Sequence, residues 1–212
     1  MATRAPAVGN RCPVVVPGYG AASVQLIADP RQTALCGRLL GLGYSARKVL
    51  AELQASDPHI ERRQIGVVDS YGNTAAFSGP TSNGYSGHVE GFQFVAMGNA
   101  VVAEAVVAAM AASLADTGDE ELWERLMRAV EAGGRAGGQA EGQNSAALLV
   151  FGTEPFALLD LRVDLHDEPI GELRRIYDWF RPLVPYYRQR VHDPYIIRED
   201  RWREQALAAP DG

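Results

Sequence analysis

The order of strand-like and helix-like segments is the feature that most constrains the fold of this chain. Strands, two helices, strands, two helices, strands and a last helix follow one another in blocks. A parallel sheet needs a crossover between successive strands, whereas hairpins and helix pairs are typical of antiparallel sheets with helices layered outside. The order therefore predicts an α+β fold and argues against a doubly wound parallel sheet.

The N-terminal third contains strands followed by a helix pair. Two apolar runs in Pro13–Ala28, separated by Pro17-Gly18, predict two short strands or one bent strand. Thr33–Leu40 is a candidate helix, and Ser45 is a candidate N-cap for a second helix over Ala46–Ala55. Antiparallel strands with a helix pair on one face are the expected result.

The middle of the chain contains the clearest hairpin signal. Ile65–Val68 and Thr74–Phe77 flank a turn whose Gly72 and Asn73 adopt positive φ at low cost. Gly79–Gly87 is rich in Gly, Ser and Asn, so we expect a polar loop after the hairpin.

The next segments alternate between strand and helix signals. We expect a strand over Phe92–Met97, a buried helix over the nearly uncharged Val101–Leu114, and a further helix over Glu120–Ala132. Thr117 or Asp119 is a candidate cap for that last helix. The two helices should pair and cover one of two sheets packed face to face.

The C-terminal part divides into a core segment and an arm. Ser145–Phe151 and Phe156–Val163 predict a second antiparallel pair, and Glu172–Phe180 predicts a helix. We therefore place one domain over residues 1–177. Residues 178–212, which are rich in Arg and aromatic side chains, form an arm.

Composition excludes several classes of protein. The 212 residues carry 20 Lys+Arg against 26 Asp+Glu, a net charge of −6, so we expect no nucleic-acid partner. No apolar run approaches the ~20 residues that span a bilayer, so we expect no membrane partner either. Cys12 and Cys36 are the only cysteines, which excludes a disulfide framework. A reduced, cytoplasmic protein is the default expectation.

Motif searches point to no cofactor and no metal. Gly41–Ala46 imitates a dinucleotide-binding fingerprint but follows a helical segment instead of a strand, so a helix–helix turn is expected. The four histidines lie at no metal-ligand spacing. His88, in the polar loop, is a binding candidate or a structural residue. Asn99 is a ligand contact or the N-cap of the helix near Val101.

A string of short motifs identifies a family resemblance. In chain order these are residues 3–9, Gly20–Gln25, Asp57-Pro58, Arg63–Asp69, Ala75–Gly79, Gly87-His88, Gly98-Asn99, Gln143–Leu148 and Asp160–Asp164. Together they resemble the domain-of-unknown-function family 1028, which is placed in the N-terminal-nucleophile (Ntn) hydrolase superfamily. The match runs from about residue 1 to residue 175.

The resemblance implies a fold and a chemistry. The fold would be a four-layer αββα sandwich. The activity would be that of an amidohydrolase, in which an N-terminal Thr, Ser or Cys attacks an amide carbonyl of a small molecule and its own α-amine acts as general base. Amide groups would stabilise the oxyanion.

The start of the chain departs from the family pattern. Met1-Ala2-Thr3-Arg4 matches the end of the family's second strand, so the first strand and its nucleophile would lie upstream. A start assigned too late, processing, and true loss of catalysis are the three explanations. We favour the first, because a sheet without two central strands would expose a long unpaired edge.

The family positions give candidate site residues but no nucleophile. Catalytic candidates are Arg4, which would orient a carboxylate or lower the pKa of an N-terminal amine, Asn99, the preferred oxyanion donor, and His88. Thr3, Gln25 and His88 are candidates for substrate binding. Arg4, Gln25, His88 and Asn99 should converge on one cleft.

Two functions and one assembly follow as expectations. The first function is an amidohydrolase of a small amide or cyclic ureide-like compound; the alternative is a catalytically inactive member that binds a small molecule or serves assembly. The arm carries much apolar surface, and its proline residues prevent it from forming one long helix. We therefore expect the arm to cross to a second copy of the chain in a homo-oligomer.

Overall fold

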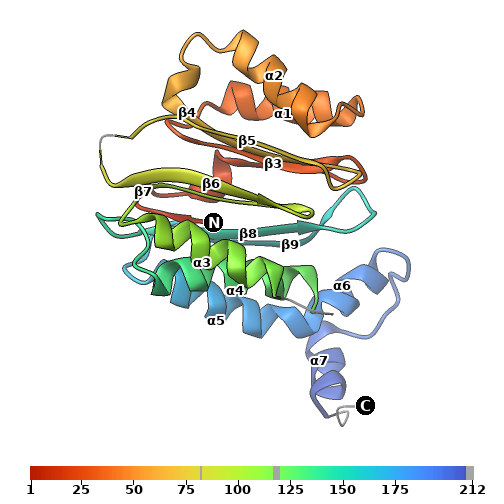
Figure 1. The fold of residues 1–212 in the computed structure, drawn as a ribbon. Coiled ribbons are helices and arrows are strands. Elements are labelled where there is room, and N and C mark those ends of the chain that lie inside the picture. Colours follow the sequence, from red (N-terminus) through yellow and green to blue (C-terminus); the bar gives the residue numbers. More distant parts are fainter. Residues whose placement is uncertain (82, 117–119, 209–212) are drawn as a thin grey trace.

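The computed structural model, which describes residues 1–81, 83–116 and 120–208, is an α+β structure with antiparallel sheets. Its helices lie outside two layers of strands (Figure 1). The first layer is the sheet β2–β3–β4–β5, and the second holds β6–β7 and β1–β8–β9. The expected block order of strands and helices is confirmed.

The first sheet has two helices on its outer face (Figure 1). Its strands are β2 (Pro13–Val16), β3 (Gly20–Leu26), β4 (Arg63–Asp69) and β5 (Thr74–Ser78), all antiparallel to their neighbours. The helices are α1 (Pro30–Gly41) and α2 (Ala46–Ser56). The hairpin around Gly72 and the Ser45 cap, whose hydroxyl accepts a hydrogen bond from the Lys48 amide, are both confirmed.

The second layer contains the strands β1 (Ala2–Thr3), β6 (Tyr85–Gly91), β7 (Phe94–Val101), β8 (Ser145–Phe151) and β9 (Ala157–Val163). Its outer face is covered by the helices α3 (Glu104–Ala115), α4 (Leu122–Arg135) and α5 (Pro169–Phe180) (Figure 1). β7 contacts β4 and β5 on its other face, and β8 contacts β2. The short β1 pairs only with Ser145 and Ala146 of β8.

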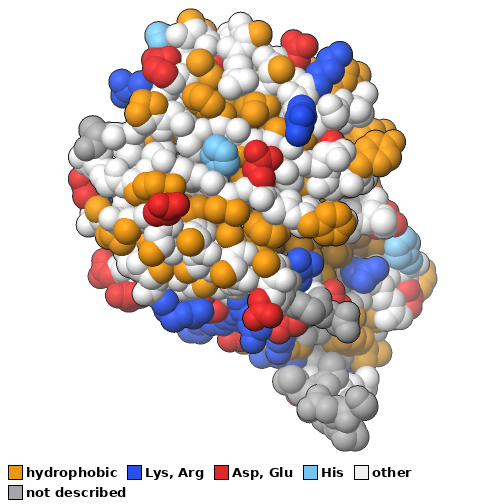
Figure 2. Space-filling model, viewed as in Figure 1, with side chains coloured by type: hydrophobic (Ala, Val, Ile, Leu, Met, Phe, Trp, Pro, Cys, Tyr) orange, Lys and Arg blue, Asp and Glu red, His pale blue; other side chains and the backbone are white. Residues whose placement is uncertain are grey.

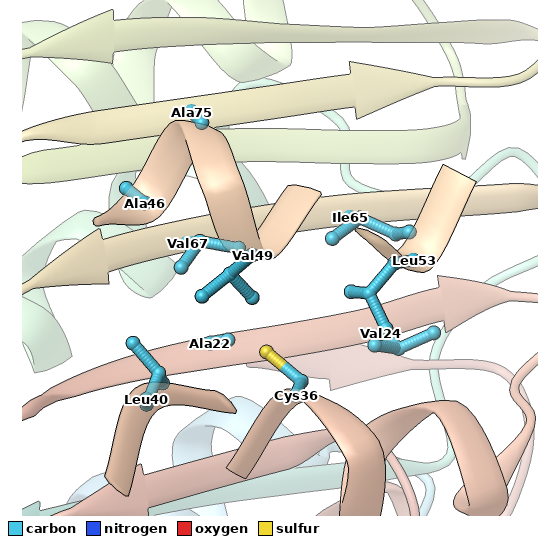
Figure 3. Packing of buried hydrophobic residues seen from close by; sticks show 10 residues of the cluster. All are labelled: Ala22, Val24, Cys36, Leu40, Ala46, Val49, Leu53, Ile65, Val67 and Ala75. Carbon is cyan, nitrogen blue, oxygen red and sulfur yellow. The ribbon is translucent and has the colours of Figure 1, made fainter. Parts of the chain in front are cut away.

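Side chains of β3 and β4 alternate between two environments, as the period of a strand requires. Ala22, Val24, Ile65 and Val67 point at α1 and α2, where they join Cys36, Leu40, Val49 and Leu53 in a buried apolar cluster (Figure 3). The intervening residues therefore face the second layer. A Cβ built on Gly66 would lie 3.0–3.2 Å from Met97 and Val95 of β7, which confirms that direction. Gln25 and Gln64 lie on this inner face of their strands, so their side chains lie between the layers.

The region from Tyr85 to Ala103 differs from the sequence-based expectation. The strand β6 begins inside the predicted polar loop, so His88 lies in a strand. Glycines and polar residues interrupt its apolar pattern, which hides the strand signal. In the turn before β7, Gln93 adopts a positive φ of 64°, a conformation usually taken by glycine, so the turn lacks the usual sequence signal.

Asn99 is not a helix cap. It lies within β7, and α3 begins only at Glu104, with Ala103 at the N-cap position and no capping side-chain bond. Two backbone hydrogen bonds hold this segment outside the helix: the Val102 amide donates to Gly138 O, and Ala100 O accepts from the Ala140 amide. The proposed caps Thr117 and Asp119 lie outside the described residues; α4 has Glu121 at its N-cap.

The C-terminal segment is only partly an arm. A 3₁₀ turn (Arg181–Leu183) and α6 (Val184–Arg190) follow α5, and α7 covers Glu199–Ala208. Leu183, Val184 and Tyr186 are buried within their own chain, which corrects the expectation that this segment lies apart from the core. Trp179, Tyr195 and Ile197 remain 48%, 94% and 42% exposed. Across the described ranges, no helix combines the length and apolar character needed to cross a bilayer.

A buried ion cluster ties the first helix pair to the sheet. Arg63 on β4 donates from Nε to Asp57 Oδ2 at 2.7 Å, and its Nη2 lies 3.4 Å from Asp29 Oδ2. Asp57 ends α2, while Asp29 caps α1 by accepting from the Arg31 amide at 2.9 Å. Arg63 also donates to the backbone oxygen of Ile27. All three charged residues of the cluster are buried.

Replacing Arg63 with Leu would leave two buried carboxylates without this cation. We expect the free energy of unfolding to fall by about 3–5 kcal/mol, the cost of removing one partner of a buried pair. Denaturant titration measures this loss. Arg198→Leu is the control, because the Arg198 side chain is 84% exposed in its pair with Asp200, and solvent-exposed pairs contribute little. Equal losses in the two variants would contradict the assignment.

The same cluster predicts acid sensitivity. Hydrogen bonds from Arg31 hold the pKa of Asp29 at about 2, and the Arg63 hydrogen bond lowers the pKa of Asp57. Aspartates in the unfolded chain titrate near ~3.9, so the stabilisation is present above about pH 5 and is lost as the pH falls toward the folded values. We expect unfolding free energies measured from pH 5 to 2 to fall, with a shallower slope in the Asp29→Asn/Asp57→Asn variant. Equal slopes would refute this cause.

Candidate functional site

The centre of the candidate site is the side-chain amide of Gln64, which is fully buried between the two layers. Its Nε2 lies 3.0 Å from Gly87 O of β6 and 2.9 Å from Gly98 O of β7. Its Oε1 accepts hydrogen bonds from Gln25 Nε2 at 2.6 Å and from Asn99 Nδ2 at 3.0 Å. Strands of both layers thus meet at one amide group.

Ser78 and His88 lie against the nitrogen side of this amide. Ser78 Oγ, at the end of β5, is 2.8 Å from Gln64 Nε2 and 2.9 Å from His88 Nδ1. Both residues are half-buried. Ser78 Oγ accepts from Gln64 Nε2, and the direction of its hydrogen bond with His88 Nδ1 depends on which ring nitrogen carries the proton.

Gln139 connects β7 to the N-terminal strand. Its Nε2 donates to Asn99 O at 3.1 Å, while its Oε1 accepts from the Thr3 hydroxyl at 3.0 Å and from the Arg4 amide at 2.6 Å. The Arg4 guanidinium extends outward and pairs with Glu141. Thr3 and Arg4 therefore belong to the same hydrogen-bonded network as Asn99.

The network contains the side chains of four of the five residues predicted from the sequence, and only the backbone amide of Arg4. Gln25 and Asn99 contact Gln64 directly, His88 is connected through Ser78, and Thr3 and Arg4 are connected through Gln139. The roles of these residues stay predictions. Gln64, Ser78 and Gln139 were not predicted as site residues from the sequence. A glutamine within the apolar run of Arg63–Asp69 is the one signal that could have indicated Gln64.

The expected cleft around these residues stays a prediction. Two cavities of about 290 and 370 Å³ are described, and both lie at the C-terminal segment. The smaller is lined by Tyr186, Arg190, Arg198, Glu199 and Asp200. The larger is lined by Phe156, Ala157, Leu158, Phe180, Val184, Tyr187, Arg188 and Val191. None of the predicted site residues contributes to either cavity.

The chemistry of the network is neutral hydrogen bonding. Within residues 1–81, 83–116 and 120–208, no group of three His, Cys, Asp or Glu residues is placed to hold a metal ion. The two thiols are poor nucleophiles, because burial raises the pKa of Cys12 and raises that of Cys36 to about 12. Amide and hydroxyl groups of this kind can bind and polarise a carbonyl group.

Comparisons with known proteins agree on one family. No curated protein is significantly similar to the chain. A solved structure of a protein from Silicibacter pomeroyi, described as a DUF1028 member, superposes with a TM-score of 0.77 at 27% sequence identity and covers 84% of this chain and 77% of its own. Residues 1–173 match the family of unknown function DUF1028. The chain therefore belongs to the DUF1028 family.

Proposed function

We propose that this protein is an amidohydrolase of the N-terminal-nucleophile type, which cleaves an amide bond of a small molecule. The stacking of helices, two strand layers and helices supports the proposal, since it is the layer order that such a fold would have (Figure 1). The position of β1 beside β8 supports it further, because the resemblance places the nucleophile strand next to Thr3 and Arg4.

The observation that carries the proposal is the orientation of Asn99. One N–H of its Nδ2 is directed to Gln64 Oε1, and its backbone oxygen is held by Gln139. An amide nitrogen has two hydrogens, so the second N–H of Asn99 is left to bind a carbonyl oxygen or the oxyanion that forms from it. A donor held before the reaction contributes most to stabilising such a charge.

The attacking group is assigned to no described residue. The Thr3 hydroxyl donates to Gln139, and both cysteines are buried as protonated thiols. This gives a second candidate function, in which the same amide cluster binds a small carbonyl compound without turnover. The two functions differ in whether bound amide is hydrolysed.

An amide panel tests the proposal. The protein is expressed from its genomic locus, so that any in-frame upstream start is used, and release of ammonia or amine from small amides and cyclic ureides is measured. We expect turnover that Asn99→Ala lowers by about 10²–10³-fold, the effect of removing one oxyanion donor. Asn10→Ala, at an exposed asparagine, is the matched control. Binding without turnover would establish the second function, and neither binding nor turnover would overturn both.

We also propose that the C-terminal segment joins copies of the chain in a homo-oligomer. Its exposed Trp179 and Tyr195 are residue types enriched at protein–protein contacts, and the exposed Ile197 adds apolar surface. Light scattering of the Tyr195→Ser/Ile197→Ser variant should give a lower mass than the parent protein. Tyr71→Ser, at an 85% exposed tyrosine of the β4–β5 turn, should leave the mass unchanged. A monomeric parent protein would contradict the proposal.

A further inference from the structure

The hydrogen-bond polarity of the site depends on which way the Gln64 amide is turned. Its nitrogen end faces Gly87 O and Gly98 O, and a carbonyl oxygen can only accept. Turning the amide over would place Oε1 against two other oxygens in a fully buried position, where unpaired polar groups are costly. The backbone of β6 and β7 therefore excludes the turned state.

The orientation of Gln64 determines the orientation of its neighbours. Gln64 Oε1 can only accept, so Gln25 and Asn99 must both present N–H groups to it, at 2.6 and 3.0 Å. Each of these two amides then retains a second N–H and a carbonyl oxygen for other partners. Gln64 thus fixes the orientation of two side-chain amides that come from different layers.

From this geometry we infer that Gln64 is a positioning residue, which turns Asn99 and Gln25 so that the site offers N–H groups to a ligand. The ligand class that this arrangement favours is a small molecule with a carbonyl or carboxylate oxygen, in preference to a cation of the same shape that can only donate. The inference rests on the proposed function for its site, but its test measures hydrogen bonding and not hydrolysis.

Stability of acidic variants tests the polarity directly. Asn99→Asp places a carboxylate, which cannot donate, against Gln64 Oε1, whereas Asn99→Ala only removes the donor. We expect the melting temperature to fall further in Asn99→Asp than in Asn99→Ala, and likewise further in Gln25→Glu than in Gln25→Ala. Asn10→Asp, at an exposed asparagine, should cause a smaller loss than either acidic variant. Acidic variants as stable as the alanine variants would overturn the inference.

A pair of isosteric probes tests the ligand class. Acetamide and the acetamidinium ion have the same shape, but the ion carries only N–H donors. In NMR titrations of the full chain, we expect acetamide to shift the side-chain amide resonances of Asn99 and Gln25, and acetamidinium to shift them less. Gln64→Met should abolish the acetamide shift while the backbone spectrum stays dispersed. A response to acetamidinium equal to that of acetamide, or an unchanged response in Gln64→Met, would refute the positioning role.

The two tests separate the inference from the proposed function. If the stability and NMR results agree with the inference but no amide is hydrolysed, Gln64 positions a binding site and the amidohydrolase proposal fails. If hydrolysis occurs and depends on Asn99, but the acidic variants are tolerated, the function stands and the assigned polarity is wrong.

Discussion

The two-residue alternation along β4 is the constraint on which both the core and the candidate site depend. Ile65 and Val67 point outward and are buried under α1 and α2, so Gln64 must point inward between the layers. A shift of one residue in register would exchange the two sets and bury the amide in the apolar cluster. The Arg63 cluster holds the start of the same strand to both helices. Packing on one face therefore places the polar group on the other.

Much of the fold was predictable because local signals agree with the final structure. The β4–β5 hairpin, the Ser45 cap and the β8–β9 pair were each indicated by residue type and spacing. The strand β6 and the start of α3 were not, for a physical reason. Glycines and polar residues interrupt the apolar pattern of β6. The start of α3 depends on pairing with distant backbone, such as that of Gly138 with Val102, and a single segment carries no signal of such a partner.

The residues of the candidate site were likewise predictable only in part. Thr3, Arg4, Gln25, His88 and Asn99 came from the family resemblance, and the structure connects them in one network, Arg4 through its backbone amide alone. The residues that connect them could not be predicted from spacing. Gln64 and Gln139 act through contacts between segments far apart in the chain, which only the folded layers bring together. The sequence indicates candidate groups, and the tertiary structure determines how their side chains are oriented.

The orientation of the Gln64 amide is the central claim, and locating its hydrogens is the most direct test. Neutron diffraction from deuterium-exchanged crystals would distinguish the nitrogen of the buried amide from its oxygen. The account predicts deuterons on Nε2 that point to the acceptors Ser78 Oγ, Gly87 O and Gly98 O, and deuterons of Gln25 and Asn99 directed at Oε1. A map with the Gln64 oxygen facing the two glycine carbonyls, or with Asn99 accepting from Gln64, would contradict it.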